Sequence, residues 1–114
     1  MTVIEQYNAG LTTDADRTLA LAMHTILWAV LPDAEMKLAY GLVGDYQPKA
    51  VCYFGINKRH IGFYPTNQPM AHFAKAGAPY QSGKGTLQFK KDVTALPIEL
   101  IQTIASWQLE HVNK

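Results

Sequence analysis

The spacing of hydrophobic and polar residues changes along the chain, and the first part has the period of a helix. Between residues 13 and 31 the apolar positions recur every three or four residues, which is typical of one buried helical face. Thr13 can cap the start of this helix, and the helix should stop before Pro32. A shorter helix is expected over residues 3–9, so the chain opens with two helices.

After Pro32 the period becomes two. Residues 36–40 alternate between apolar and polar side chains, as in a strand with one buried face. Residues 50–56 are apolar on both faces, which predicts a central strand, and residues 61–64 continue this pattern after a tight basic segment. This arrangement indicates an antiparallel hairpin with the basic residues at its tip.

The last third of the chain returns to shorter elements and then to a helix. We expect a helix from about Gln68 to Lys75, a loop over residues 78–85, a strand over residues 86–89 and a C-terminal helix beginning at Pro97. The order of the elements predicts an α+β fold, with an antiparallel β-sheet packed against the N- and C-terminal helices.

Length and composition limit the class of protein. The 114 residues suit one compact domain, which we expect to span residues 1–114. A net charge of +1 makes nucleic acid an unfavoured partner, and the longest apolar stretch is too short to cross a bilayer. Cys52 is a single cysteine, expected as a buried apolar residue, and it is compatible with a reducing compartment. These features predict a cytoplasmic protein without a membrane partner.

The candidate chemistry centres on the segment Lys58–Pro65. An imidazole side chain suits acid–base work and metal binding, which makes His60 the best single candidate, but no second histidine lies at a ligand spacing from it, so a structural role at the hairpin tip is favoured. Lys58 and Lys84 can attract an anionic group, and Tyr40 and Tyr64 carry hydroxyls that can reach a pocket.

Four blocks of the sequence resemble a known family, in the family's order. The blocks are Leu31–Gly41, Lys58 with His60–Pro65, Gly83–Phe89 and Leu96–Ile101. On these residues the chain is similar to the YdhG-like domain family over nearly its full length. The resemblance implies a small cytosolic bacterial α+β domain from a family that is mostly uncharacterised, some of whose members are described as iron chaperones. Val43 and Gln108 depart from the family pattern, since they stand where a proline and a basic residue are usual.

Three functions follow as hypotheses. The first is a non-enzymatic binding or carrier module for a small anion or an acidic protein surface, with a pocket near the Lys58–Pro65 hairpin bounded by Tyr40, Lys58, His60, Tyr64 and Lys84. The second is an iron chaperone, in which His60 and carboxylates such as Asp33, Glu35 or Asp45 would be the ligands. The third is an enzyme with His60 as general acid or base. The sequence leaves homo-oligomer formation open.

Overall fold

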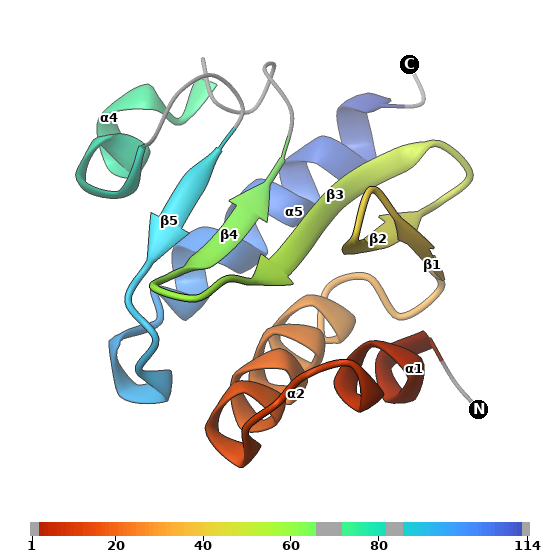
Figure 1. The fold of residues 1–114 in the computed structure, drawn as a ribbon. Coiled ribbons are helices and arrows are strands. Elements are labelled where there is room, and N and C mark those ends of the chain that lie inside the picture. The colour runs from red at the N-terminus through yellow and green to blue at the C-terminus, as the bar shows by residue number, and fades with distance from the viewer. Residues whose placement is uncertain (1–2, 66–71, 82–85, 113–114) are drawn as a thin grey trace.

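The computed structural model describes residues 3–65, 72–81 and 86–112 (Figure 1). Helices and strands follow one another in the order α1 (Val3–Ala9), α2 (Asp14–Trp28), β1 (Glu35–Ala39), β2 (Leu42–Tyr46), β3 (Ala50–Ile56), β4 (Ile61–Tyr64), α4 (Ala74–Gly77), the 3₁₀ turn η1 (Ala78–Tyr80), β5 (Leu87–Phe89), the 3₁₀ turn η2 (Val93–Ala95) and α5 (Ile98–Val112).

The strands form one antiparallel sheet in the order β1-β2-β3-β4-β5. Helices α2 and α5 both pack against β3, and in Figure 1 α5 lies behind β3, β4 and β5. One face of the sheet therefore meets the helices, and we call the opposite face the outer face. The predicted fold class, an α+β arrangement with an antiparallel sheet against N- and C-terminal helices, is confirmed.

The core lies between the sheet and the helices. Its largest fully buried side chains include Phe54 and Phe63 from neighbouring central strands, Met23 from α2 and Ile101 from α5. Cys52 is also fully buried, as expected for a small apolar residue. No helix in the described part of the chain combines the length and apolarity that crossing a bilayer requires.

The β1–β2 hairpin differs from the sequence-based expectation. The predicted strand over residues 36–40 ends at Ala39, because Tyr40 and Gly41 form a two-residue turn with φ angles of 57° and 72°. Positive φ at both central positions is the signature of a type I′ turn, whose twist matches that of the flanking strands. The returning strand, Leu42–Tyr46, was not predicted, because Gly44 and Asp45 interrupt its apolar pattern.

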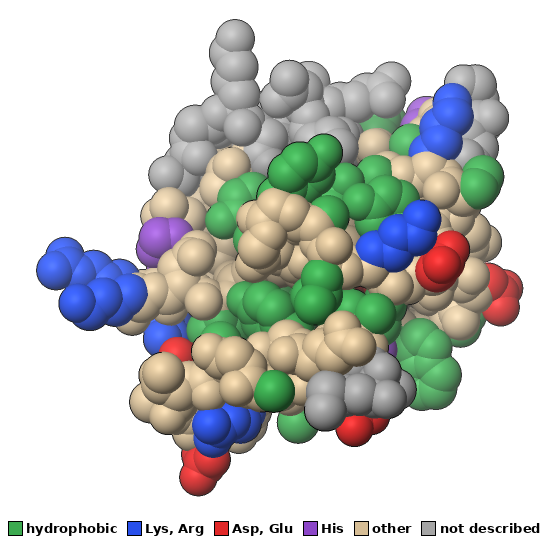
Figure 2. Space-filling view, turned by 45° about the vertical axis from the view of Figure 1, so that its right-hand side comes forward, with side chains coloured by type: hydrophobic (Ala, Val, Ile, Leu, Met, Phe, Trp, Pro, Cys, Tyr) green, Lys and Arg blue, Asp and Glu red, His purple; other side chains and the backbone are tan. Residues whose placement is uncertain are grey.

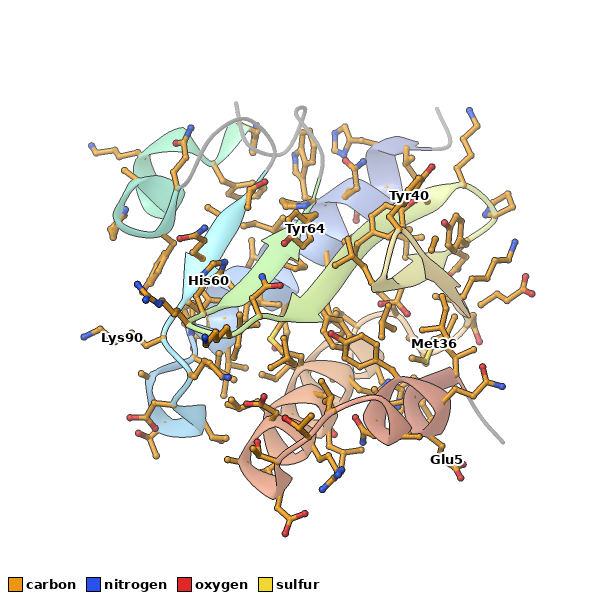
Figure 3. The ribbon with its side chains drawn as sticks, in the orientation of Figure 1. Glu5, Met36, Tyr40, His60, Tyr64 and Lys90 are labelled. Atoms are coloured by element: carbon orange, nitrogen blue, oxygen red, sulfur yellow. The ribbon has the colours of Figure 1, made fainter. Side chains whose placement is uncertain are left out.

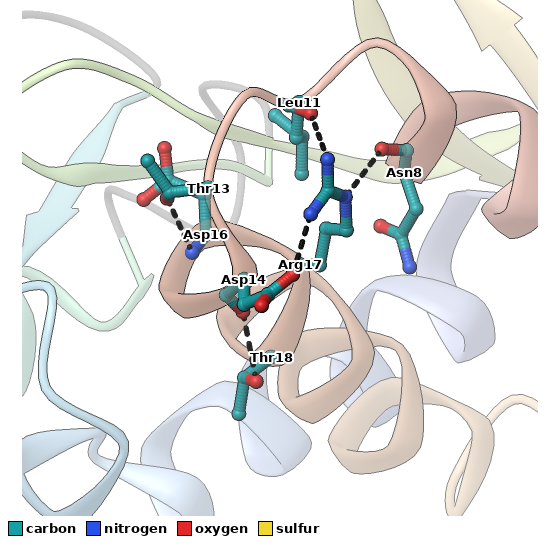
Figure 4. Close-up of polar contacts among 7 residues, drawn as sticks. All are labelled: Asn8, Leu11, Thr13, Asp14, Asp16, Arg17 and Thr18. Carbon is teal, nitrogen blue, oxygen red and sulfur yellow. Dashed lines mark hydrogen bonds and ion pairs between the residues drawn. The ribbon is translucent and has the colours of Figure 1, made fainter.

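Polar contacts fix the corner between α1 and α2 (Figure 4). The Thr13 hydroxyl caps α2 by accepting a hydrogen bond from the Asp16 backbone N–H at 3.1 Å. The Arg17 guanidinium donates to the backbone carbonyl of Leu11 at 2.8 Å and to that of Asn8 at 3.4 Å, near the end of α1. One side chain thereby holds the two helices at a fixed angle.

The remaining predicted elements are found in part. Helices were expected over residues 3–9, from Thr13 and from Pro97, and α1, α2 and α5 confirm them. Of the helix expected from about Gln68 to Lys75, residues 68–71 lie outside the described residues, and α4 begins only at Ala74. The expected loop over residues 78–85 begins with η1.

Candidate functional site

The predicted site residues come from three parts of the sheet. Tyr40 lies in the β1–β2 turn, Lys58 and His60 in the β3–β4 turn, and Tyr64 at the end of β4. Lys84 lies outside the described residues. Figure 3 shows Tyr64 between His60 and Tyr40 across the sheet, so the β3–β4 turn is separated from Tyr40. A role for these residues in one shared pocket stays a prediction.

His60 closes the β3–β4 turn together with Asn57. The Asn57 backbone N–H donates to the His60 carbonyl at 2.9 Å, and the Asn57 side-chain amide donates to Nε2 of His60 at 3.2 Å. The second bond occupies the lone pair of Nε2, one of the two ring nitrogens through which a histidine can accept a proton or bind a metal. Chemistry at Nε2 would therefore require this bond to break.

The described residues do not assemble a metal site. No group of three or more His, Cys, Asp or Glu side chains that could hold a metal ion occurs in the ranges 3–65, 72–81 and 86–112. Of the carboxylates named in the iron hypothesis, Asp33 and Glu35 are exposed, whereas Asp45 is only 6% exposed. The assignment of His60 as a metal ligand remains a prediction.

A cluster of tyrosines covers part of the outer face. The ring of Tyr53 meets the rings of Tyr40 and Tyr46 edge to face, with centroids 5.9 and 5.8 Å away. The hydroxyls of Tyr46 and Tyr53 share a hydrogen bond of 2.9 Å, and this bond, together with burial, raises the pKa of Tyr53 to about 12. The Lys37 ammonium lies 4.8 Å from the centre of the Tyr46 ring. These rings form a connected aromatic surface with a cation on it.

Glycines lie directly beneath this surface, because the residues of a strand alternate between faces. A Cβ at Gly44 would come within 2.7 Å of the Tyr53 ring, and a Cβ at Gly62 would collide with the Tyr64 hydroxyl. At Gly55 a Cβ would lie 2.5 Å from Leu42. The absence of side chains at these three positions lets the tyrosine rings and Leu42 rest on the backbone.

Tyr40 holds an unfavourable backbone conformation. A φ of 57° places it in the left-handed region, which costs a residue with a Cβ about 1–2 kcal/mol. The residue is nonetheless 87% exposed, so burial of its ring in the core does not offset that cost. Strain of this kind is a reason to look for function. In Figure 2, which turns the β1–β2 side forward, hydrophobic side chains (tyrosine included) gather at the centre, with Lys and Arg as well as Asp and Glu around them.

The described residues also line two cavities elsewhere on the molecule. The larger, about 610 Å³, runs along α5 and is bounded by Trp107, by His72 and Phe73, and by Val30 after α2. The smaller, about 300 Å³, is lined by Pro79, Tyr80, Gln88, Lys90 and Ala95. None of the described residues that line them is a predicted site residue. The larger cavity could not be predicted from the sequence, because the segments that line it are distant in the chain.

Comparisons with known proteins bear on the fold. No model of a protein family matches the chain, and no curated protein matches it. Among solved structures, a protein of the DUF1801 family (ydhg) from Bacillus subtilis superposes with a TM-score of 0.88, covering 98% of this chain and 92% of that one. The two sequences are 14% identical, so the likeness concerns the fold. It agrees with the YdhG-like resemblance that the sequence indicated.

Proposed function

We propose that the domain is a non-enzymatic binding or carrier module, and that it binds a small aromatic anion on the outer face of the sheet. The observation that carries this proposal is Tyr40, an exposed ring held at a strained turn and in edge contact with the tyrosine cluster. Strain of about 1–2 kcal/mol at an exposed residue is kept most readily where the residue has a use beyond stability.

The chemistry of the outer face supports an aromatic and anionic ligand. Tyrosine rings offer flat apolar contact with hydroxyls at their edges, and few rotatable bonds are immobilised on binding. Lys37 lies on the Tyr46 ring, and Lys58 and Arg59 are exposed in the β3–β4 turn. Lys37 is also 4.0 Å from the exposed Glu35 carboxylate, and at this separation an exposed ion pair contributes little to stability. A cation placed on aromatic rings attracts a planar anion.

Titration with 8-anilinonaphthalene-1-sulfonate, a fluorescent aromatic anion, tests this proposal. Tyr40→Asn removes the ring but suits the left-handed turn, so the fold should persist. We expect saturable dye binding that weakens about three- to tenfold in Tyr40→Asn, the range for loss of one aromatic contact. Lys58→Gln should weaken binding less, and the Lys58 effect should diminish with added salt.

Trp28→Phe is the matched control for this titration, because Trp28 is another exposed aromatic residue, 59% exposed, and lies on α2 rather than on the sheet. Its dye affinity should equal that of the parent protein. The proposal fails if no saturable binding is found, or if Tyr40→Asn binds the dye as tightly as the parent.

The iron-chaperone hypothesis is separated from this proposal by anaerobic titration with ferrous iron. Saturable binding that disappears in His60→Ala and survives in Tyr40→Asn would favour iron as the ligand. Under our proposal, ferrous iron leaves the dye affinity unchanged.

A further inference from the structure

The groove along α5 has a regular line of oxygen-bearing side chains. Glu99, Thr103, Ser106 and Glu110 all line it, at spacings of four, three and four residues. At 100° per residue, positions eleven apart differ by only about 20°, so the two glutamates share one face of the helix. They are about 16 Å apart along the axis, with the two hydroxyls between them.

Aromatic side chains also line the groove. Trp107 stacks on His72 at 4.6 Å between centroids and on His111 at 3.9 Å, and it meets Phe73 edge to face at 5.9 Å. The His111 ring is itself held by a 2.7 Å contact between its Nδ1 and the Trp107 carbonyl. These contacts fix the indole ring, so the groove has a rigid aromatic wall in addition to its polar line.

Among the described residues, the charges along the groove have one sign. Neither Glu99 nor Glu110 forms an ion pair with another described residue, and the described side chains that line the groove include no Lys or Arg. Glu110 lies in the last turns of α5, where the carbonyl end of the helix adds negative potential. A ligand in this groove should therefore be a cation.

We propose that the α5 groove binds a linear aliphatic polyamine. Its terminal ammonium groups would pair with Glu99 and Glu110, the intervening nitrogen would donate to the Thr103 and Ser106 hydroxyls, and the methylenes would lie against Trp107 and Phe73. The volume of about 610 Å³ falls within the usual range for small-molecule sites. This site is separate from the outer face and prefers the opposite charge.

The test titrates spermidine into the full chain and follows the intrinsic fluorescence of Trp107. The protein carries Trp28→Phe, so that Trp107 is the one remaining tryptophan. We expect a saturable fluorescence change and a matching heat in calorimetry. Glu99→Gln and Glu110→Gln should each weaken binding about three- to tenfold, as expected for loss of one charge-assisted contact, and the double variant should abolish it.

Asp33→Asn removes an equally exposed carboxylate outside the groove and should leave the affinity unchanged. Ethylamine, with a single charge, should bind at least tenfold more weakly than spermidine. The proposal is overturned if spermidine produces no saturable change, if Asp33→Asn weakens binding as much as Glu110→Gln, or if ethylamine binds as well as spermidine. The spermidine test does not depend on the outer face, so a failure of the dye to bind there would not change its outcome.

Discussion

A single residue, Asp45, imposes a pH dependence on the core. The register pairs Asp45 with Cys52 across β2 and β3, and a β-bulge follows at Tyr46. Both side chains are buried. Burial raises the pKa of Asp45 to about 6, and burial together with the Asp45 charge raises that of the Cys52 thiol. The thiol is therefore a poor nucleophile, as the sequence suggested.

Asp45→Asn should stabilise the protein at neutral pH. Since the pKa of Asp45 rises from 3.8 in the unfolded chain to about 6 in the fold, the folded state holds its proton more tightly. The contribution of Asp45 to the free energy of unfolding is thus most favourable below pH 4. It falls by about 3 kcal/mol as pH rises toward 7. Asparagine does not titrate, so the difference in unfolding free energy between variant and parent should grow from pH 4 to pH 7.

Urea denaturation at several pH values measures this difference. Asp33→Asn is the control at an exposed position, and its unfolding free energy should differ from that of the parent by the same small amount at every pH. A constant difference between Asp45→Asn and the parent over this range would contradict the assigned burial of a titrating carboxylate.

At the scale of elements, the corner between α1 and α2 depends on one arginine. Arg17 donates hydrogen bonds to the backbone carbonyls of Asn8, in the last turn of α1, and of Leu11, which follows α1. Its guanidinium also forms an ion pair with the Asp14 carboxylate at 2.6 Å. The Asp14 side chain is 99% exposed, so this ion pair should contribute little. The carbonyl bonds are what positions α1.

Arg17→Met should lower the unfolding free energy by about 1–2 kcal/mol, because two carbonyls lose their donor. Asp14→Ala, which removes only the exposed partner, should lower it by less than about 1 kcal/mol. Chemical denaturation measures both, and amide hydrogen exchange in α1 should speed up in Arg17→Met alone. Equal losses in the two variants would show that the ion pair, rather than the carbonyl bonds, holds the corner.

At the scale of the whole molecule, Lys91 joins segments that are far apart in the chain. Its ammonium lies 2.6 Å from the Asp16 carboxylate in α2 and donates to the Lys58 carbonyl in the β3–β4 turn at 3.3 Å. The side chains of Lys91 and Asp16 are only 22% and 18% exposed. Lys91 thereby links the segment after β5 to the start of α2 and to the hairpin tip.

A double-mutant cycle with Lys91→Met and Asp16→Asn should give a coupling energy of about 1 kcal/mol that persists in moderate salt, because the pair is partly buried. The pair of Lys37 and Glu35 is the control, at 4.0 Å with side chains 52% and 74% exposed, and its coupling should be near zero. Coupling energies that do not differ between the two cycles would contradict this ranking.

The sequence by itself determined the elements whose pattern is local. Apolar period and capping by Thr13 predicted α2, and the two-faced apolar run of residues 50–56 followed by a basic turn predicted the β3–β4 hairpin. β2 was missed, because Gly44 and Asp45 break the alternation on which a strand prediction depends. The surroundings of Gly44 and Asp45 become visible only in the folded sheet, where these residues lie opposite Tyr53 and Cys52.

Tertiary structure decided which side chains meet. The sequence placed Tyr40, Tyr64 and His60 among the candidates, but strand register sets Tyr40 against Tyr53, and the hairpin turn commits His60 to Asn57. The line from Glu99 to Glu110 is readable from helical spacing, whereas the groove exists only because His72 and Phe73 pack beside Trp107. Periodicity reports what one segment can bury, and only chain folding brings two distant segments together to make a site.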